Sequence, residues 1–247
     1  MTGMMMIQKI LDGERNPVKL AKLRNPHCQS SEDEIAQALH GDYRREHVFV
    51  LRQAWHAYHF VLGQIRDCDR ELERLVTEID KQVDANQTPP PPREKAPQPP
   101  HWNDVQFAAQ DGRTLLYECF GVDVTRIPGL DVSSALTLFT EVGADLTPWP
   151  TEKHFASYLG LVPNVQSSAG KVRSSRTRKV ASRAAGVFRL AAQAVIRSKT
   201  ALGACYRRLK GRLGGSKALT ATALKIAVIF YHLVKDRAPY QELGETA

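Results

Sequence analysis

The sequence predicts a mainly α protein, in which a long helical arm is followed by a compact helical domain. Apolar residues recur at helical spacing over residues 48–83, far enough for a single long helix. A proline-rich run at 86–100 then ends that pattern. Shorter segments of helical periodicity follow, separated by Gly and Pro, and no segment requires a strand. We therefore expect a helical region at 1–85, a linker at 86–103 and a domain at 104–247.

The charge is divided unevenly along the chain. The 247 residues carry a formal net charge of +8 and are 43% hydrophobic, which is enough to build a core. Residues 1–160 hold 17 basic and 23 acidic residues, whereas residues 161–247 hold 17 basic and 3 acidic residues. A strongly cationic surface attracts polyanions, most often phosphate backbones. The last third therefore favours nucleic acid as a partner over an acidic protein or a membrane surface.

The cysteines and the hydropathy of the chain indicate where in the cell the protein is located. The four cysteines lie far apart and form no CxxC motif, so neither a zinc site nor a disulfide framework is indicated. The first residues do not have the pattern of a signal peptide. The longest apolar stretch, near 224–234, is interrupted by Lys225 and His232 and is too short to span a bilayer. We expect a cytoplasmic, nucleoid-associated protein that does not enter a membrane.

The amino-terminal region is predicted to contain short helices before the long one. Residues 4–23 read as helices broken at Gly13 and Pro17. Residues 31–40 begin with Ser31 as a helix cap and have acidic residues in the first turn.

The long helix carries an apolar stripe whose steps alternate between three and four residues. Its members are Val48, Leu51, Trp55, Tyr58, Leu62, Ile65, Asp69, Leu72, Val76, Ile79 and Val83. Only Asp69 is polar, and one helix cannot bury such a stripe alone. The pattern predicts a coiled coil between two copies of the chain. A helical hairpin with residues 4–40 is the alternative. The proline-rich run that follows predicts an extended, exposed spacer.

The domain after the spacer begins with two predicted helices. Residues 101–121 are expected to form one helix, and a Pro-Gly turn leads into a second within 127–143. The expected buried side chains are Trp102, Phe107, Leu115, Leu116, Phe120, Ala135, Leu136, Leu138, Phe139 and Val142. This unit resembles a helix-hairpin-helix, whose turn exposes backbone amides to a DNA phosphate. An ordinary helical turn is the alternative.

The rest of the domain is predicted to be helical except for one cationic segment. A helix at 150–160 should end at Gly160, and 163–179 should form a loop or a short hairpin. Helices are expected at about 180–198, 201–212 and 216–236, with a break at Gly214-Gly215.

The cationic segment is the candidate site. It holds Ser167, Ser168, Ser174 and Ser175 among Lys171, Arg173, Arg176, Arg178 and Lys179. A serine hydroxyl can attack a phosphodiester when a base takes its proton and cations stabilise the charge that develops on the phosphate. Arginine suits this task because its planar fork can hold two phosphate oxygens. From residue types alone, helix capping or passive phosphate contact is the commoner role of such serines.

Other catalytic chemistries find less support. A metal nuclease needs several carboxylates around a divalent ion, and after residue 160 only Asp236, Glu242 and Glu245 are acidic. His56 and His59 lie on the long helix without paired ligands, and the chain has no Walker or dinucleotide-binding loop. The sequence predicts no metal site.

Several stretches, in the same order along the chain, are similar to transposases of the insertion-sequence 110/116/902 type. They are ILDGERNPVKLAKL, HVFVLRQ, IPGLDVSSALTLFTEVG, FASYLGLVPNVQSSAGKVRSSRTRK and KALTATALKIAVIFYHLVKDRAPYQELG. The most specific part is 160–179, whereas the proline-rich run is not part of the usual pattern.

The resemblance implies a three-part protein: a RuvC-like domain with four acidic metal ligands, a coiled coil for dimerisation, and a transposase domain with a nucleophilic serine. It also implies a structured guide RNA. It places the nucleophile at Ser168, with Ser167 as the adjacent competitor. The cations of the same segment, Lys171, Arg173, Arg176, Arg178 and Lys179, are then expected to bind phosphate. This chain starts where the coiled-coil part starts, so Mg is expected only in the RuvC-like domain and no cofactor in this chain.

Two functions follow from the resemblance. The first is DNA transposition by site-specific recombination, with Ser168 attacking a DNA phosphodiester in a domain that also binds guide RNA. The truncated chain is then expected to be inactive alone. The alternative is a non-catalytic nucleic-acid-binding dimer, a transposase remnant or modulator of the full-length enzyme.

Overall fold

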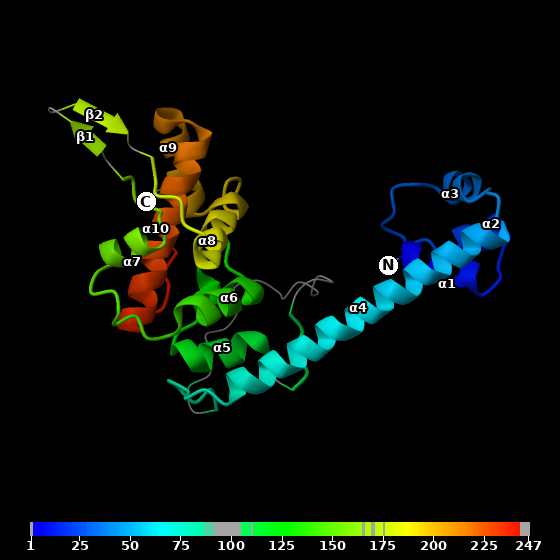
Figure 1. Ribbon diagram of the computed structural model, residues 1–247, viewed down its shortest axis with the longest axis horizontal. Helices are drawn as coiled ribbons and strands as arrows, with labels where there is room; N and C mark the ends of the chain where they lie inside the picture. The colour runs from blue at the N-terminus through cyan, green and yellow to red at the C-terminus, as the bar shows by residue number, and fades with distance from the viewer. Residues whose placement is uncertain are drawn as a thin grey trace. The chain divides into compact units, whose positions relative to one another are not determined.

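The computed structural model describes residues 2–86, 88, 90, 105–109, 111–164, 166–168, 171–174 and 176–242 (Figure 1). The chain divides into two compact units, Met1–Cys68 and Asp69–Ala247. Over the described ranges the fold is helical apart from one two-stranded hairpin, which confirms the mainly α class. The division between the units falls within the long helix. Most of the predicted linker, 86–103, lies outside the described residues.

The first unit opens with three short helices, α1 (Thr2–Leu11), α2 (Pro17–Ala21) and α3 (Glu32–Ala38). The predicted breaks are confirmed, because Gly13 adopts a φ of +104° and Asn16 caps α2. Ser31 and Glu34 form a capping box at the start of α3, with each side chain bonded to the other's backbone amide. Local sequence signals therefore set these three helices.

The long helix, α4 (Arg45–Thr77), comes next and is unbroken over its whole length. It ends at Thr77, so Ile79 and Val83, which the stripe assigned to it, lie beyond the helix. The early part of the stripe is only partly covered: Tyr58 is 40% and Ile65 43% exposed. A hydrogen bond of 3.5 Å joins the Arg52 side chain to the Leu11 carbonyl, within the segment of the alternative helical hairpin.

The last two turns of α4 belong to the second unit and pack within it. Val76 joins the hydrophobic core. The buried carboxylate of Asp69 accepts a hydrogen bond from the amide of Gln106 at 3.2 Å. Glu73, also buried, accepts hydrogen bonds from the amides of Ala108 and Ala109, both at 2.8 Å. The one polar member of the stripe therefore anchors a neighbouring segment of the same chain.

The helix predicted at 101–121 is shorter than expected. It is α5 (Gly112–Phe120), and residues 105–109 are not helical because the carboxylates of α4 hold their amides. Leu115, Leu116 and Phe120 are buried as predicted, and Phe107 is half-buried. Trp102 lies outside the described residues.

Helices α6 and α7 follow the sequence prediction closely. After a single turn, η1 (Val124–Arg126), Asp131 caps α6 (Val132–Val142) by accepting from the Ser134 amide at 2.7 Å. All five predicted apolar positions of α6 are buried. Helix α7 (Glu152–Tyr158) is capped by Thr151, and Gly160 follows it with a φ of +63°.

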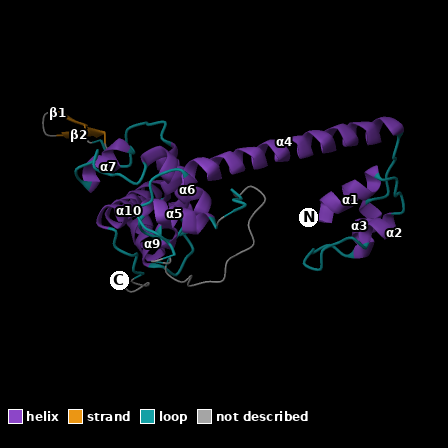
Figure 2. Cartoon of the chain, turned by 90° about the horizontal axis from the view of Figure 1, so that it is seen from below, coloured by secondary structure: helices purple, strands orange, loops and turns teal. Residues whose placement is uncertain are grey.

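The cationic segment forms an antiparallel hairpin of β1 (Gln166–Ser168) and β2 (Lys171–Ser174). A bridge between Pro163 and Thr177 closes its base. The hairpin extends away from the helices of its unit in both views (Figure 1 and Figure 2). Of the two alternatives left open by the sequence, loop or hairpin, the structure has the hairpin.

Three helices complete the unit: α8 (Arg183–Ala194), α9 (Ala201–Leu213) and α10 (Gly215–Asp236), as predicted. Helix α10 packs against α7, α8 and α9, and Phe155, Phe188 and Phe230 meet at the centre with ring centroids 5.6 to 6.3 Å apart. By length and composition α10 could cross a membrane, yet half of its most apolar window is buried inside this unit. That burial is typical of a core helix.

Candidate nucleic-acid interface

Ser168 lies at the end of β1, where its side chain is exposed. It pairs in register with Lys171, the first residue of β2. The antiparallel pairing therefore places the predicted nucleophile position opposite a cationic residue. The side chains of Ser167, Lys171 and Arg173 lie outside the described part of the chain, so only the backbone register locates them.

Three of the predicted phosphate-binding residues follow the hairpin, and all of them are exposed: Arg176, Arg178 and Lys179. Arg178 donates to the Ser157 carbonyl at 3.3 Å, at the end of α7. A Cβ on Gly160 would stand 2.6 Å from the Val180 side chain and 3.0 Å from the Arg178 carbonyl. Glycine at 160 therefore lets residues 178–180 approach the end of α7 closely, and this contact fixes the base of the hairpin.

A hollow of about 540 Å³ lies beside that base. It is lined by Thr177, Arg178, Lys179, Val180, Ala181 and Arg189. Arg189 comes from α8 and was not singled out from the sequence, because nothing in its local pattern distinguishes it from any half-exposed helical cation. Three cations from two elements therefore line one hollow.

The hairpin separates Ser168 from the cations at its base. The bridge between Pro163 and Thr177 lies five positions along the strand from Ser168. At about 3.3 Å per residue this is roughly 17 Å. Arg178 and Lys179, which follow that bridge, are therefore separated from Ser168 by the length of the hairpin.

The electrostatic field around the hairpin is one-sided. Between Glu152 and Asp236 the sequence contains no acidic residue, although it contains 17 Lys and Arg. An ion pair that reaches this stretch joins Arg183 to Glu141 at 3.7 Å, and the arginine side chain there remains 79% exposed. Such a surface concentrates polyanions.

Residues 123–207 match the transposase IS116/IS110/IS902 family. The resemblance seen in the sequence is thereby confirmed over this part of the chain, hereafter the transposase segment. It runs from the turn before η1 into α9 and contains Ser168 and its five cations. No curated protein and no solved structure matches the chain. The match supports a role in DNA transposition or recombination.

The family resemblance implies Mg only in a RuvC-like domain. Among the residues the structure describes, no group of three or more His, Cys, Asp or Glu side chains could hold a metal ion. The described residues therefore offer no such group for this Mg.

The Pro-Gly turn of the transposase segment packs against α8. Gly129 has a φ of +91°, and a Cβ there would stand 2.5 Å from the Ala191 carbonyl oxygen. The Leu130 amide donates to the Ile127 carbonyl at 3.0 Å, and the Asp131 carboxylate occupies the start of α6. Close packing therefore accounts for the glycine, and a negative charge already stands where a helix-hairpin-helix would receive a phosphate.

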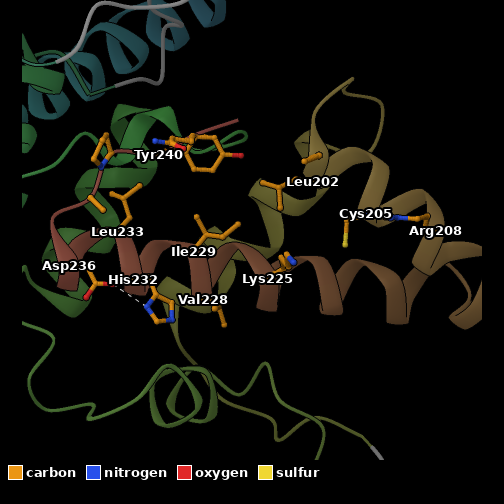
Figure 3. A pocket seen from close by; sticks show the side chains of 14 residues that line it. Leu202, Cys205, Arg208, Lys225, Val228, Ile229, His232, Leu233, Asp236 and Tyr240 are labelled. Carbon is orange, nitrogen blue, oxygen red and sulfur yellow. Dashed lines mark hydrogen bonds and ion pairs between the residues drawn. The ribbon is translucent and has the colours of Figure 1, made fainter. Parts of the chain in front are cut away.

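A second cavity, of about 580 Å³, lies between α9, α10 and the tail at 238–241 (Figure 3). Leu202, Ile229 and Leu233 supply apolar lining, and His232 and Asp236 contact each other at 3.3 Å on its edge. Glu242 anchors the tail by accepting from the Ala201 amide and the Tyr240 hydroxyl, at 2.8 and 2.9 Å. None of the predicted site residues lines this cavity, so it is separate from the Ser168 hairpin.

Proposed function

We propose that this chain acts on DNA in transposition and that Ser168 is the nucleophile that attacks a DNA phosphodiester. One observation carries the proposal. Ser168 is exposed at the end of a hairpin, opposite Lys171, in a part of the transposase segment whose sequence contains no Asp or Glu. An exposed hydroxyl in a cationic environment can reach the phosphate of a bound strand.

The reaction would transfer a strand end to the protein. A bond forms between the Ser168 oxygen and phosphorus, and the bond between phosphorus and one sugar oxygen of the strand breaks. The serine proton passes to a base, and the departing sugar oxygen gains a proton. A carboxylate base would have to come from outside residues 153–235, because that stretch has none.

The cations would contact different phosphates, according to their positions on the hairpin. Lys171 and Arg173, on β2, are the candidates for the attacked phosphate and its neighbours. Arg176, Arg178 and Lys179 would hold flanking phosphates, since the base of the hairpin lies about 17 Å from Ser168. The same one-sided charge would suit a structured guide RNA, which the family resemblance implies as a second partner. A cytoplasmic location at the nucleoid follows from DNA as substrate.

Self-association through α4 is the other part of the proposal. Between Arg45 and Cys68 the helix leaves a broad apolar surface exposed. Its members are Phe49, Val50, Tyr58, Phe60, Val61 and Ile65, at 40 to 67% exposure. Four of the six lie outside the predicted stripe, so the surface is wider than a two-helix seam. Contiguous apolar surface of this kind is normally covered by another chain.

The nucleophile can be tested in a mixture of this chain, an intact family member, its guide RNA and labelled DNA. We expect a covalent DNA adduct on the 27.6-kDa chain, resolved from the larger partner by denaturing electrophoresis. Ser168→Ala should abolish this adduct, and Ser167→Ala should preserve it. An adduct that persists unchanged in Ser168→Ala would refute the assignment.

The second candidate function is a non-catalytic nucleic-acid-binding dimer that modulates an intact transposase. It is favoured by the absence of carboxylates from 153–235 and of a metal-binding group among the residues described. The same mixture separates the two functions. If the wild-type chain forms no adduct but lowers adduct formation by the intact enzyme, the chain is a modulator.

A further inference from the structure

The hollow beside the base of the hairpin is formed by two parts of the second unit. Residues 177–181, between β2 and α8, line most of it. Arg189, near the middle of α8, completes the lining. These six residues are called the basal hollow, and its volume of about 540 Å³ lies in the range of ligand sites. Folding therefore brings Arg189 to the same place as Arg178 and Lys179.

The cations of the basal hollow have donor groups available for a ligand. Lys179 and Arg189 form no hydrogen bond or ion pair with any residue that the structure describes. Arg178 donates from one Nη to the Ser157 carbonyl at 3.3 Å, which holds its guanidinium beside the end of α7. A guanidinium has five N–H donors, so this bond leaves others for a ligand. The arginine is therefore positioned without being used up.

No charge on α8 accounts for Arg189. The residues three and four positions away on the helix are uncharged: Ala185, Gly186, Ala192 and Gln193. Arg189 is nevertheless half-buried. Partial burial of a cation without a counter-charge is unfavourable, because it removes part of the hydration of that cation. An anion bound in the basal hollow would supply the counter-charge.

The chemistry of the lining favours a backbone phosphate over a base. Unpaired bases bind by stacking on aromatic side chains, and none of the described residues that line the basal hollow is aromatic. The guanidinium groups of Arg178 and Arg189 can each hold two phosphate oxygens, and the Lys179 ammonium adds a point charge. The basal hollow lies within the transposase segment, whose match supports DNA as the partner.

We propose that the basal hollow binds one phosphate of the DNA and that Arg189 is a further phosphate-binding residue. This inference rests on the proposed function, because it takes the DNA of that reaction as the ligand. It goes beyond the flanking contacts of Arg178 and Lys179, because it places these two cations and α8 around the same phosphate. Binding there fixes the DNA at the base of the hairpin, while Ser168 lies at the other end.

Removal of the Arg189 charge tests the site directly. In titrations of the full chain with a labelled DNA duplex, Arg189→Gln should weaken binding several-fold, and this loss should shrink as the salt concentration rises. Arg45→Gln, which removes the same charge from an exposed position on α4, should bind as the wild type does. Thermal melts verify that both variants are folded. Wild-type affinity in folded Arg189→Gln would overturn the proposal.

Ala181 allows a test that leaves every cation in place. It is exposed and lines the basal hollow, so Ala181→Glu would add a carboxylate that competes with the phosphate for the cations. Ala181→Gln adds a side chain of the same size without the charge. We expect the glutamate variant to lose clearly more affinity for the duplex at low salt. Equal losses in the two variants would contradict an anion site.

A double variant distinguishes one shared phosphate from two separate ones. If Lys179 and Arg189 hold the same phosphate, loss of one cation already weakens its binding. Lys179→Gln with Arg189→Gln should then cost less affinity than the product of the two single losses. A loss equal to that product would refute the shared phosphate. Parallel titrations use an RNA duplex, and a loss in Arg189→Gln that is confined to RNA would refute DNA as the ligand.

The outcome is separable from that of the proposed function. Wild-type affinity in Arg189→Gln, with the adduct lost in Ser168→Ala, would refute only the phosphate site in the basal hollow. Reduced affinity in Arg189→Gln, with the adduct still formed by Ser168→Ala, would refute only the nucleophile.

Discussion

Arg113 and Asp123 form a buried ion pair that the sequence did not reveal. Arg113 donates to the Asp123 carboxylate at 2.9 Å from Nε, and Thr125 donates to the same carboxylate from its amide and its hydroxyl. The pair fixes the turn between α5 and η1. It could not be predicted because the two residues meet only once that turn has folded, and neither belongs to a periodic pattern.

Removing one partner of this pair should destabilise the second unit. Asp123→Ala would remove the buried carboxylate that pairs with the Arg113 guanidinium, so the free energy of unfolding should fall by about 3 to 5 kcal/mol. Urea denaturation followed by circular dichroism measures it. Glu71→Ala breaks an exposed pair with Arg74 and should hardly move the midpoint. Similar small effects of both substitutions would contradict this role for the buried pair.

Two glycines that look alike in the sequence should respond in opposite directions. Gly129→Ala would place a methyl group against the Ala191 carbonyl at a positive φ and should cost about 2 kcal/mol or more. Gly186→Ala, inside α8 with nothing within 4 Å of the added atom, should stabilise by about 0.5 to 1 kcal/mol. Thermal melts compare the two. An equal effect at both positions would show that the turn does not pack on α8 as described.

Burial raises the pKa of the Cys119 thiol to about 11. A thiol whose pKa is higher in the folded than in the unfolded chain contributes stability that is complete below the unfolded value, near 9. That stability is lost as the pH rises towards 11. The fall in unfolding free energy between pH 9 and 11 should therefore be smaller in Cys119→Ala than in the wild type. Identical pH profiles would contradict the burial of this thiol.

At the scale of elements, local signals predicted most helices and tertiary contacts decided the exceptions. The caps of α3 and the buried face of α6 could be predicted, because capping and periodicity act within a few residues. The start of α5 could not, because Asp69 and Glu73 bind the amides of residues more than 30 positions away. The apolar stripe on α4 is continuous in the sequence, but in the structure its carboxy-terminal part packs within the second unit.

The first part of α4 carries the prediction about assembly. Leu62→Asp should convert a dimer to a monomer, because it introduces a charge into the packed seam. Leu62→Met keeps an apolar side chain of similar size at the same position and should not. Sedimentation equilibrium of both variants provides the measurement. A monomeric wild-type chain, or loss of the dimer in both variants, would refute the assignment of the seam.

At the scale of the whole molecule, the charge imbalance after residue 160 predicted a cationic region that includes the hairpin. The choice of Ser168 within that region came from the family resemblance. The separation between Ser168 and the cations at the base depends on the strand pairing, and the contribution of Arg189 depends on how α8 packs. Both lie beyond what spacing along a sequence can predict.

The most direct measurement is to locate the DNA on the protein. Trypsin cuts after Lys153 and Lys171, so a covalent adduct digested with nuclease and trypsin should leave a nucleotide on the peptide 154–171, at Ser168. Tandem mass spectrometry reads the modified residue. A nucleotide on Ser168 is the result we predict, whereas a nucleotide on another residue of this chain would contradict the account.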